Sequence, residues 1–191
     1  MSNVHHDTNH VIRAIRPDEW EKVRGLRITS LKDPAAPVAF LETVEQAEAR
    51  DDTFWQDRAA GSSHGGAARQ FVAEAPDGSW SGSVVMLVEQ AGAADFFEGE
   101  IAMDQGHLVG VYVRPEYRGT GLTEALFDTA LDWAWSLESP ALERVRLFVH
   151  EDNGRAQAFY RRAGFTFTGT VVPMPEGDGA MELELAIPRP E

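Results

Sequence analysis

Residues 118–123 read Arg-Gly-Thr-Gly-Leu-Thr and form a turn whose residue types suit phosphate binding. The preceding run 111–113 is β-branched and aromatic, which predicts a strand, and the residues after the turn predict a helix. Gly119 and Gly121 allow the backbone to approach an anion closely, while the helix points its unpaired N–H groups and positive dipole end toward it. Arg118 adds a positive charge. The spacing therefore predicts a site for an anionic cofactor.

Two better-known phosphate-binding motifs do not fit this turn. No Gly-Lys-Ser or Gly-Lys-Thr follows it, as a P-loop requires, and the glycine spacing differs from that of a dinucleotide-binding fingerprint. Many strand–helix turns carry two glycines for steric reasons alone. A second motif is therefore needed before the turn indicates a cofactor.

That second motif lies at residues 153–165, which read Asn-Gly-Arg-Ala-Gln-Ala-Phe-Tyr-Arg-Arg-Ala-Gly-Phe. Together the two segments resemble the GNAT superfamily of acyl-CoA-dependent N-acetyltransferases. The family's motifs are Arg/Gln-x-x-Gly-x-Gly/Ala and Asn-x-x-Ala-x-x-Phe-Tyr-x-x-x-Gly-Phe, and the match to the later one is complete. Thr123 stands where the family usually has Gly or Ala, but its main-chain N–H remains available to an anion. The resemblance is strong over residues 107–165.

The resemblance implies acetyl-CoA as co-substrate, with its pyrophosphate at the glycine turn. It also implies that main-chain N–H groups of Val111 and Val113 stabilise the negative charge that develops on the thioester oxygen. The cofactor-binding residues expected from the two motifs are Val111, Tyr112, Val113, Arg118, Gly119, Thr120, Gly121, Leu122, Thr123, Asn153, Ala156 and Tyr160.

Tyr160 is the residue expected to protonate the departing thiolate, because the family commonly places a tyrosine acid at this position of the motif. The alternative is a packing role, against the sheet or the pantetheine arm. Asn153, by the same resemblance, orients the cofactor or a water molecule, although an asparagine here is equally suited to cap the following helix.

The general base is left open between two histidines and water. An alkylammonium with a pKa of about 10.4 must lose a proton before it can attack a thioester. His107 begins the central strand where some family members carry a catalytic glutamate, and an imidazole suits proton abstraction at neutral pH. His150, with Glu151, ends the next strand and is the competing choice, and a water chain needs neither side chain.

The expected elements follow the GNAT order of strand, two helices, three strands, helix, strand, helix and two strands. The fold class expected is α/β (α+β): a GNAT fold with a mixed, mostly antiparallel seven-stranded sheet, splayed between strands 4 and 5 and flanked by about four helices. The periodicities predict strands at 11–15, 70–74, 80–88, 107–113, 145–149, 165–172 and 181–187, and helical segments from 17 to about 31, at 37–60, 121–137 and 153–163, with a Gly/Ser loop at 61–67.

The stretch 88–106 carries five acidic residues and no Lys or Arg. A solvated hairpin tip is the simpler interpretation, because charged turns are ordinary on protein surfaces. The alternative is an electrostatic guide for a cationic amine. Further acidic residues at 175–178 point the same way. The five residues are Glu89, Asp95, Glu98, Glu100 and Asp104.

Length and composition indicate one globular domain at residues 11–191, preceded by a flexible tail at 1–10. The chain has 191 residues, of which 43% are hydrophobic. It has no cysteine, which excludes disulfides, thiolate metal sites and an acyl-cysteine intermediate, so direct transfer is expected. His5, His6 and His10 lie in the expected tail without metal-ligand spacing, so no metal is expected.

The charge balance excludes several partners. A net charge of −14 would repel nucleic acid and an anionic membrane surface. No apolar run reaches the roughly 20 residues needed to span a bilayer, and residues 1–10 lack the hydrophobic segment of a signal peptide. A cytoplasmic protein without nucleic-acid or membrane partners is therefore expected.

The sequence thus predicts an N-acetyltransferase that moves acetyl from acetyl-CoA to a primary amine by direct attack in a ternary complex. The expected acceptor is a small cationic amine, either a metabolite or an antibiotic. Two alternatives remain: acetylation of a protein N-terminus or lysine, and a non-catalytic acyl-CoA-binding sensor. Dimerisation is frequent in the family, so a homodimer is allowed, but nothing in the sequence specifies its surface.

Overall fold

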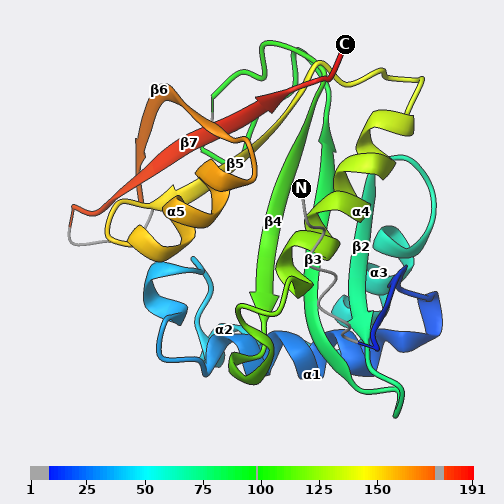
Figure 1. Ribbon diagram of the computed structural model, residues 1–191. Coiled ribbons are helices and arrows are strands. Elements are labelled where there is room, and N and C mark those ends of the chain that lie inside the picture. Colours follow the sequence, from blue (N-terminus) through cyan, green and yellow to red (C-terminus); the bar gives the residue numbers. More distant parts are fainter. Residues whose placement is uncertain (1–8, 98, 175–178) are drawn as a thin grey trace, which may run out of the picture.

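The computed structural model describes residues 9–97, 99–174 and 179–191 as one mixed sheet with helices on both faces (Figure 1). The predicted order of elements is confirmed. The strands are β1 Val11–Ala14, β2 Ala68–Glu74, β3 Trp80–Glu89, β4 Gln105–Val113, β5 Arg144–His150, β6 Thr166–Pro173 and β7 Met181–Pro188, and the helices are α1 Trp20–Leu31, α2 Val44–Glu48, α3 Asp52–Ser63, α4 Leu122–Ser136 and α5 Gly154–Arg162, with short 3-10 turns η1 Pro17–Glu19, η2 Ala36–Val38 and η3 Pro115–Tyr117.

The sheet has the order β1-β2-β3-β4-β5-β7-β6 and opens in its middle. All neighbouring strands pair antiparallel except β4 and β5, which are parallel. Only three residue pairs join these two, ending at His107 opposite Arg146, although each strand continues for several residues. The sheet is therefore splayed between strands 4 and 5, as expected from the resemblance (Figure 1).

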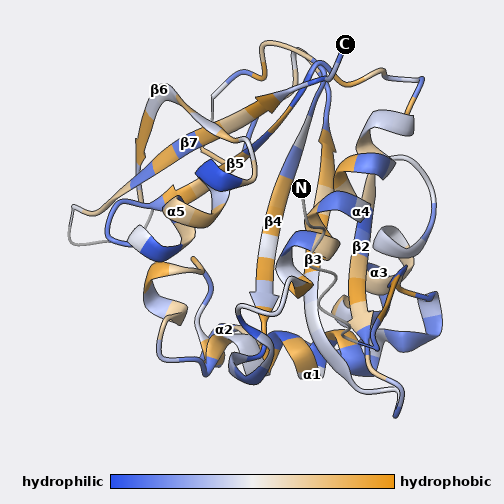
Figure 2. Cartoon of the chain, viewed as in Figure 1, coloured by the Kyte–Doolittle hydropathy of each residue, from blue (hydrophilic) through white to orange (hydrophobic). Residues whose placement is uncertain are grey.

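Alternating side chains along the strands build two separate cores, one on each face. Phe71 and Ala73 of β2 face a core formed with α4 and α5, while Val72 between them faces a second core formed with α1 and α3. Figure 2 shows hydrophobic and hydrophilic residues mixed along α1 and α4, as expected for helices that turn one side toward a sheet. Burial on both faces fixes the position of β4, the strand that borders the opening.

An extra residue in β4 forms a bulge beside the opening. Val85 of β3 faces Val109, and Ser83 faces Tyr112, so two steps along β3 match three along β4. Gly110 lies within this bulge with φ of 62°, a left-handed conformation that glycine adopts without a Cβ penalty. A bulge leaves backbone groups outside the strand ladder, so this part of β4 can offer an N–H to a ligand.

Residues 37–60, predicted as one helical region, do not form a single helix. This region is divided into η2, α2 and α3, because two side chains start new helices within it. Thr43 accepts a hydrogen bond from the backbone N–H of Gln46, and Asp51 accepts one from that of Phe54. Helix α3 then continues to Ser63, so the loop predicted from residue 61 begins later. The described residues thus form five α-helices where the sequence predicted about four.

Only the last two residues of the tail predicted at 1–10 lie within the described part of the chain. Residues 1–8, including His5 and His6, lie outside the described part of the chain. His10, by contrast, lies against the domain, with its ring Nε2 2.8 Å from the Ser81 hydroxyl and its ring centre 4.9 Å from that of Tyr117. None of the helices in the described ranges is long and apolar enough to cross a membrane.

Candidate functional site

Two hollows meet where the sheet opens. One is a cleft of about 310 Å³ on the side of α4 and α5, here called the cleft, and the other is a cavity of about 1240 Å³ on the side of α1 and α3, here called the large cavity. Their walls are continuous, so a reactant in one can reach a reactant in the other. The residues that line both are Ala39, Phe40, Leu108, Val109, Gly110, Phe148 and Glu182.

The glycine turn lies beside the cleft, with Arg118, Gly119 and Thr123 among the residues that line it. Gly119 and Gly121 have φ of 76° and 87°, which a residue with a side chain rarely adopts. Gly119 lines the cleft and a Cβ placed on it would contact nothing within 4 Å, so its backbone faces open space. Gly121 is the N-cap of α4, whose first-turn N–H groups have no partner within the helix. An anion can bind there.

Not every residue of the predicted cofactor set lines the cleft. Thr120 turns its hydroxyl inward to donate to the Tyr117 carbonyl at 2.6 Å, and Leu122 is core, with 1% of its surface exposed. Those that do line the cleft are Val111, Tyr112, Val113, Arg118, Gly119, Thr123, Asn153, Ala156 and Tyr160.

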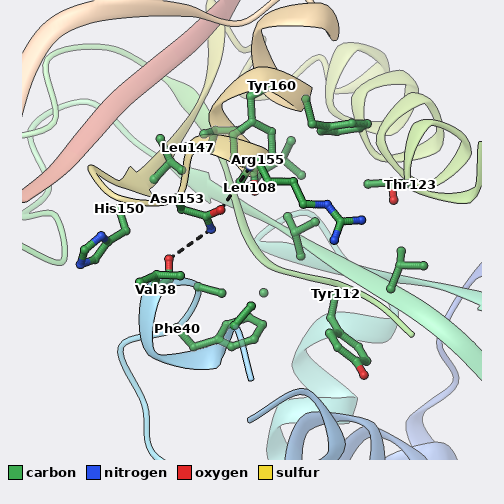
Figure 3. Close-up of a pocket in the computed structure, with 18 of the residues that line it drawn as sticks. Val38, Phe40, Leu108, Tyr112, Thr123, Leu147, His150, Asn153, Arg155 and Tyr160 are labelled. Carbon is green, nitrogen blue, oxygen red and sulfur yellow. Dashed lines mark hydrogen bonds between the residues drawn. The ribbon is translucent and has the colours of Figure 1, made fainter. Parts of the chain in front are cut away.

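Arg118 lines the cleft, but its guanidinium is already engaged. It forms an ion pair with the buried carboxylate of Asp33, and its Nε donates to the carbonyl of Val113 at 2.9 Å. Arg155, left unassigned from the sequence, is exposed at the start of α5 and reaches across the cleft toward Thr123 (Figure 3). Arg155 is therefore the better-placed cation for a phosphate, and Arg118 mainly ties β4 to the loop after α1.

Asn153 uses its side chain to hold two elements together. Its Oδ1 accepts from the backbone N–H of Ala156 at 3.2 Å, which caps α5, and its Nδ2 donates to the carbonyl of Val38 at 3.2 Å (Figure 3). The capping role that the sequence left open is thus present. The second bond joins α5 to η2 across the opening, so Asn153 helps set the width of the cleft.

Tyr160 lines the cleft from α5 within an aromatic cluster. Its ring stacks on that of Phe127, with centres 5.7 Å apart and planes 20° from parallel. Burial, together with the negative charge of Glu182, raises the pKa of Tyr160 well above its usual range. The hydroxyl therefore stays protonated at neutral pH, as a proton donor must, and its packing fixes where it points.

The two histidines considered as bases lie on different sides of the opening. His107 lines only the large cavity, and its Nδ1 lies 3.3 Å from a carboxylate oxygen of Glu89. His150 lines only the cleft, where its Nδ1 accepts from the backbone N–H of Asp152 at 3.0 Å and its ring points away from Tyr160 (Figure 3). Neither ring borders both hollows.

Glu182 is a site residue that the sequence did not reveal. It lies on β7 opposite His150 of β5, is 8% exposed and lines both hollows. Burial raises the pKa of its carboxyl to about 7. In the sequence it alternates with Leu183 and Leu185 and so resembles the outer face of an ordinary strand. One sequence feature could have pointed to Glu182: a second glutamate, Glu184, lies on the same face of the strand.

The acidic stretch 88–106 is not a solvated hairpin tip at Glu89 and Asp95. Both carboxylates are mostly buried and bind Arg146 of β5, at 2.8 Å for Glu89 and 3.5 Å for Asp95. Burial alone would raise the pKa of Glu89, but hydrogen bonds from His107 and Arg146 outweigh it and lower that pKa to about 2. Arg146 also binds Glu184 at 2.9 Å. Arg146 therefore offsets part of the local negative charge. Glu98 and residues 175–178 lie outside the described chain.

The large cavity is mainly apolar and aromatic. Phe97 and Phe148 meet edge to face with ring centres 4.8 Å apart, and Phe96 packs on Phe97. Arg58 of α3 also lines it, and its pKa is lowered by burial and by repulsion from Arg27 and Arg50. Among the described residues no group of His, Asp and Glu is arranged to hold a metal ion.

Comparison with known proteins gives one family and several relatives. Residues 29–165 match the family described as Acetyltransferase (GNAT) family. A mycothiol acetyltransferase from Beutenbergia cavernae is 41% identical over 61 residues, which is 32% of this chain and 20% of that protein. The chain thus spans about a fifth of the length of that relative.

Solved structures agree with the fold over nearly the whole chain. An acetyltransferase of the GNAT family from Streptococcus pneumoniae has a TM-score of 0.72 at 17% identity, covering 94% of this chain and 99% of that one. NAA60 of Arabidopsis thaliana in complex with acetyl-CoA has a TM-score of 0.65 at 18% identity, covering 93% and 97%. Because the sequence identities are below 20%, the likeness to these structures shows a shared fold and nothing further.

Proposed function

The chain belongs to the acetyltransferase (GNAT) family, and from that premise we propose that it transfers an acetyl group from acetyl-CoA to a primary amine. The observation that carries the proposal is the meeting of the cleft and the large cavity at the opening between β4 and β5. One hollow carries the anion-binding turn and the other has room for an acceptor. Direct transfer needs such a junction, because no cysteine is present to hold the acyl group.

The residues of the cleft suit acetyl-CoA. The turn at Gly119, the first-turn N–H groups of α4 and the guanidinium of Arg155 provide donors for pyrophosphate. The narrow part of the cleft runs past Leu108 and Leu147, whose apolar side chains suit a pantetheine arm. When bound, the co-substrate supplies an activated acetyl thioester.

Two groups of this chain would act on the thioester. The bulge of β4 offers the main-chain N–H of Val111 to the carbonyl oxygen, where negative charge develops during attack. Tyr160 holds its proton at neutral pH and would give it to the departing sulfur. Both groups lie on the wall of the cleft, on opposite sides of the opening.

The acceptor is an amine with an apolar body. The sequence favoured a small cationic amine because of the acidic stretch 88–106, but Glu89 and Asp95 are paired with Arg146. The large cavity is lined by phenylalanines and by Arg58, but also by Glu42 and Asp57. Its aromatic lining favours an acceptor with an apolar body, such as an apolar amine or a peptide N-terminus.

The first test is thiol release from acetyl-CoA with a panel of arylalkylamines, apolar amino acids, short peptides, polyamines and aminoglycosides. The absence of cysteine keeps the background of a thiol reagent low. Turnover of at least one class supports the enzyme. Binding of acetyl-CoA with no turnover of any class would favour a sensor that binds acyl-CoA without catalysis.

A further inference from the structure

We propose that Glu182 is the general base of the acetyl transfer, accepting the proton that the acceptor ammonium must lose. The inference deepens the proposed function and rests on it. It replaces the two histidines considered from the sequence, since a base must reach the amine where it meets the thioester.

His107, His150 and Glu182 differ in where they lie relative to the junction of the two hollows. The amine arrives through the large cavity and the thioester lies in the cleft, so the reacting nitrogen stands at their junction. His107 lines only the large cavity and His150 only the cleft. Glu182 lines both. Of these three side chains it is the one placed at the junction.

Within the described residues, the carboxylate of Glu182 makes no hydrogen bond or ion pair with another side chain or with the backbone. Its neighbour on the same face, Glu184, is bound by Arg146, Arg144 and Thr168. Its oxygens are nevertheless not among the described buried side-chain atoms that lack a partner, so the carboxylate is accessible from the hollows that it lines. Glu182 thus differs from Glu184, whose role in the sheet is accounted for by its partners.

The groups that face Glu182 leave it free to accept a proton. From β5 the residue opposite is His150, whose Nδ1 already accepts a backbone hydrogen bond, and from β6 it is the apolar Val172. From α5 the facing group is Tyr160, which is held protonated. The acids deeper in the large cavity, Glu89 and Asp95, are bound by Arg146. No cation among these holds Glu182 ionised at low pH.

Glu182 takes one proton from the ammonium, and the freed lone pair forms the C–N bond to the acetyl carbon. As the C–S bond breaks, the sulfur takes the proton of Tyr160, and the phenolate regains the second proton that the nitrogen sheds. Glu182 then releases its proton to solvent, so each turnover yields one amide, one free thiol and one proton.

The decisive experiment compares Glu182→Gln with wild type in a pH profile of kcat/KM, using the best amine of the panel. We expect Glu182→Gln to lower kcat/KM about 100-fold or more. The acid limb of the wild-type profile, near the pKa of about 7 that burial gives Glu182, should disappear in the variant. His107→Gln and His150→Gln should keep that limb, and Glu143→Gln, at an exposed carboxylate before β5, is the matched control.

A second readout does not depend on turnover. Because its folded pKa lies above the unfolded one, ionised Glu182 lowers stability as pH rises from about 4.5 to 7. Glu182→Gln should therefore raise the Tm by about 5 °C at pH 8 and leave it unchanged at pH 5. Affinity for acetyl-CoA should not change.

The results of these experiments distinguish a failure of the base assignment from a failure of the proposed function. Wild-type kcat/KM in Glu182→Gln, or an unchanged acid limb, would overturn the base assignment while the proposed function stands. Loss of that limb in His150→Gln instead would move the role to that histidine. A wild-type protein that binds acetyl-CoA but acetylates no amine would overturn the proposed function and the base together.

Discussion

At the scale of single residues, Tyr160 has the clearest chemical assignment. Its hydroxyl lines the cleft, its ring is fixed by stacking on Phe127, and burial keeps it protonated. The proposed acid role requires all three properties. A packing role alone would require only the ring.

We therefore predict that Tyr160→Phe lowers kcat by about 100-fold and leaves the Kd for acetyl-CoA unchanged, because the phenyl ring keeps its packing and only the proton donor is lost. Steady-state kinetics and calorimetric titration measure the two quantities. Tyr117→Phe, which removes a hydroxyl outside both hollows, is the control. Equal rates in wild type and Tyr160→Phe would leave that tyrosine with a packing role.

Substitution of Arg118 and of Arg155, which both line the cleft, should separate effects on acetyl-CoA binding from effects on stability. Arg155→Ala should weaken acetyl-CoA binding about tenfold, since it removes an exposed cation that faces phosphate. Arg118→Met should instead lower the free energy of unfolding, because the buried carboxylate of Asp33 loses its partner. Titration of acetyl-CoA and urea unfolding measure these effects, and Arg161→Ala on the outer side of α5 is the control. The reverse pattern would return the phosphate role to Arg118.

At the scale of elements, the bulge of β4 and the ion-pair cluster on β5 define the opening. The bulge shifts the register of β4 by one residue at Gly110, and Arg146 joins β3 and β7 to β5 just where the ladder to β4 ends. Arg146 lies 27 positions after Gly119 in the sequence, whereas Gly110 lies only 9 positions before it.

Substitution of Gly110 by Ala should reduce both stability and activity. A residue with a Cβ at φ of 62° costs about 1–2 kcal/mol, and relief of that strain straightens the strand and removes the free N–H. Gly78→Ala, at φ of 82° in the β2–β3 turn, should lose similar stability without a loss of kcat. If both variants kept full kcat, the bulge would have no catalytic importance.

Arg146→Met should destabilise the fold by about 3–5 kcal/mol at pH 7, because it leaves the buried carboxylates of Glu89 and Glu184 without their partner. The folded pKa of Glu89 lies below its unfolded value, so the contribution of this pair is full above about pH 5 and disappears as pH falls toward 2. The difference between wild type and variant should shrink over that range in urea titrations. Arg24→Met, at an exposed pair with Asp52, is the control. A constant difference from pH 7 to pH 3 would contradict the assignment.

At the scale of the whole molecule, the net charge and the lining of the large cavity favour different acceptors. The chain carries a net charge of −14, which alone would favour a polycation. The large cavity, however, is aromatic and is bordered by Arg58, whose guanidinium is desolvated and near two other arginines. The cavity chemistry decides which acceptor binds, because contacts at short range outweigh a field that salt screens.

We predict that an apolar dipeptide with a free carboxylate is acetylated with a kcat/KM about tenfold higher than its C-terminal amide, because Arg58 binds the carboxylate. Spermidine should be the poorest of the three. In Arg58→Met the acid and the amide should become equal, with the amide unaffected. A preference for spermidine in both proteins would restore the cationic acceptor favoured by the sequence.

The sequence was sufficient for the features that are local. The glycine turn, the cap at Asn153 and the alternation along β7 follow from neighbouring residues, and the order of elements follows from them. The partners of Arg146 lie 57 and 38 positions away along the chain, and the exposure of Glu182 to two hollows arises only when β7 inserts beside β5. Long-range pairing therefore hid the base candidate and brought Arg146 against Glu89 and Asp95, two of the acidic residues that had favoured a cationic acceptor.

The short ladder between β4 and β5 also has a mechanical consequence. Three residue pairs join the two parts of the sheet, β1–β4 and β5–β7, so we expect the sheet to bend more easily along this line than between fully paired strands. The hydrogen bond from the Asn153 side chain to the Val38 carbonyl is a further link across the opening. An elongated molecule bound between the two parts of the sheet would contact both of them and restrict this bending. The amides flanking the short ladder should therefore exchange their hydrogens more slowly once acetyl-CoA is bound.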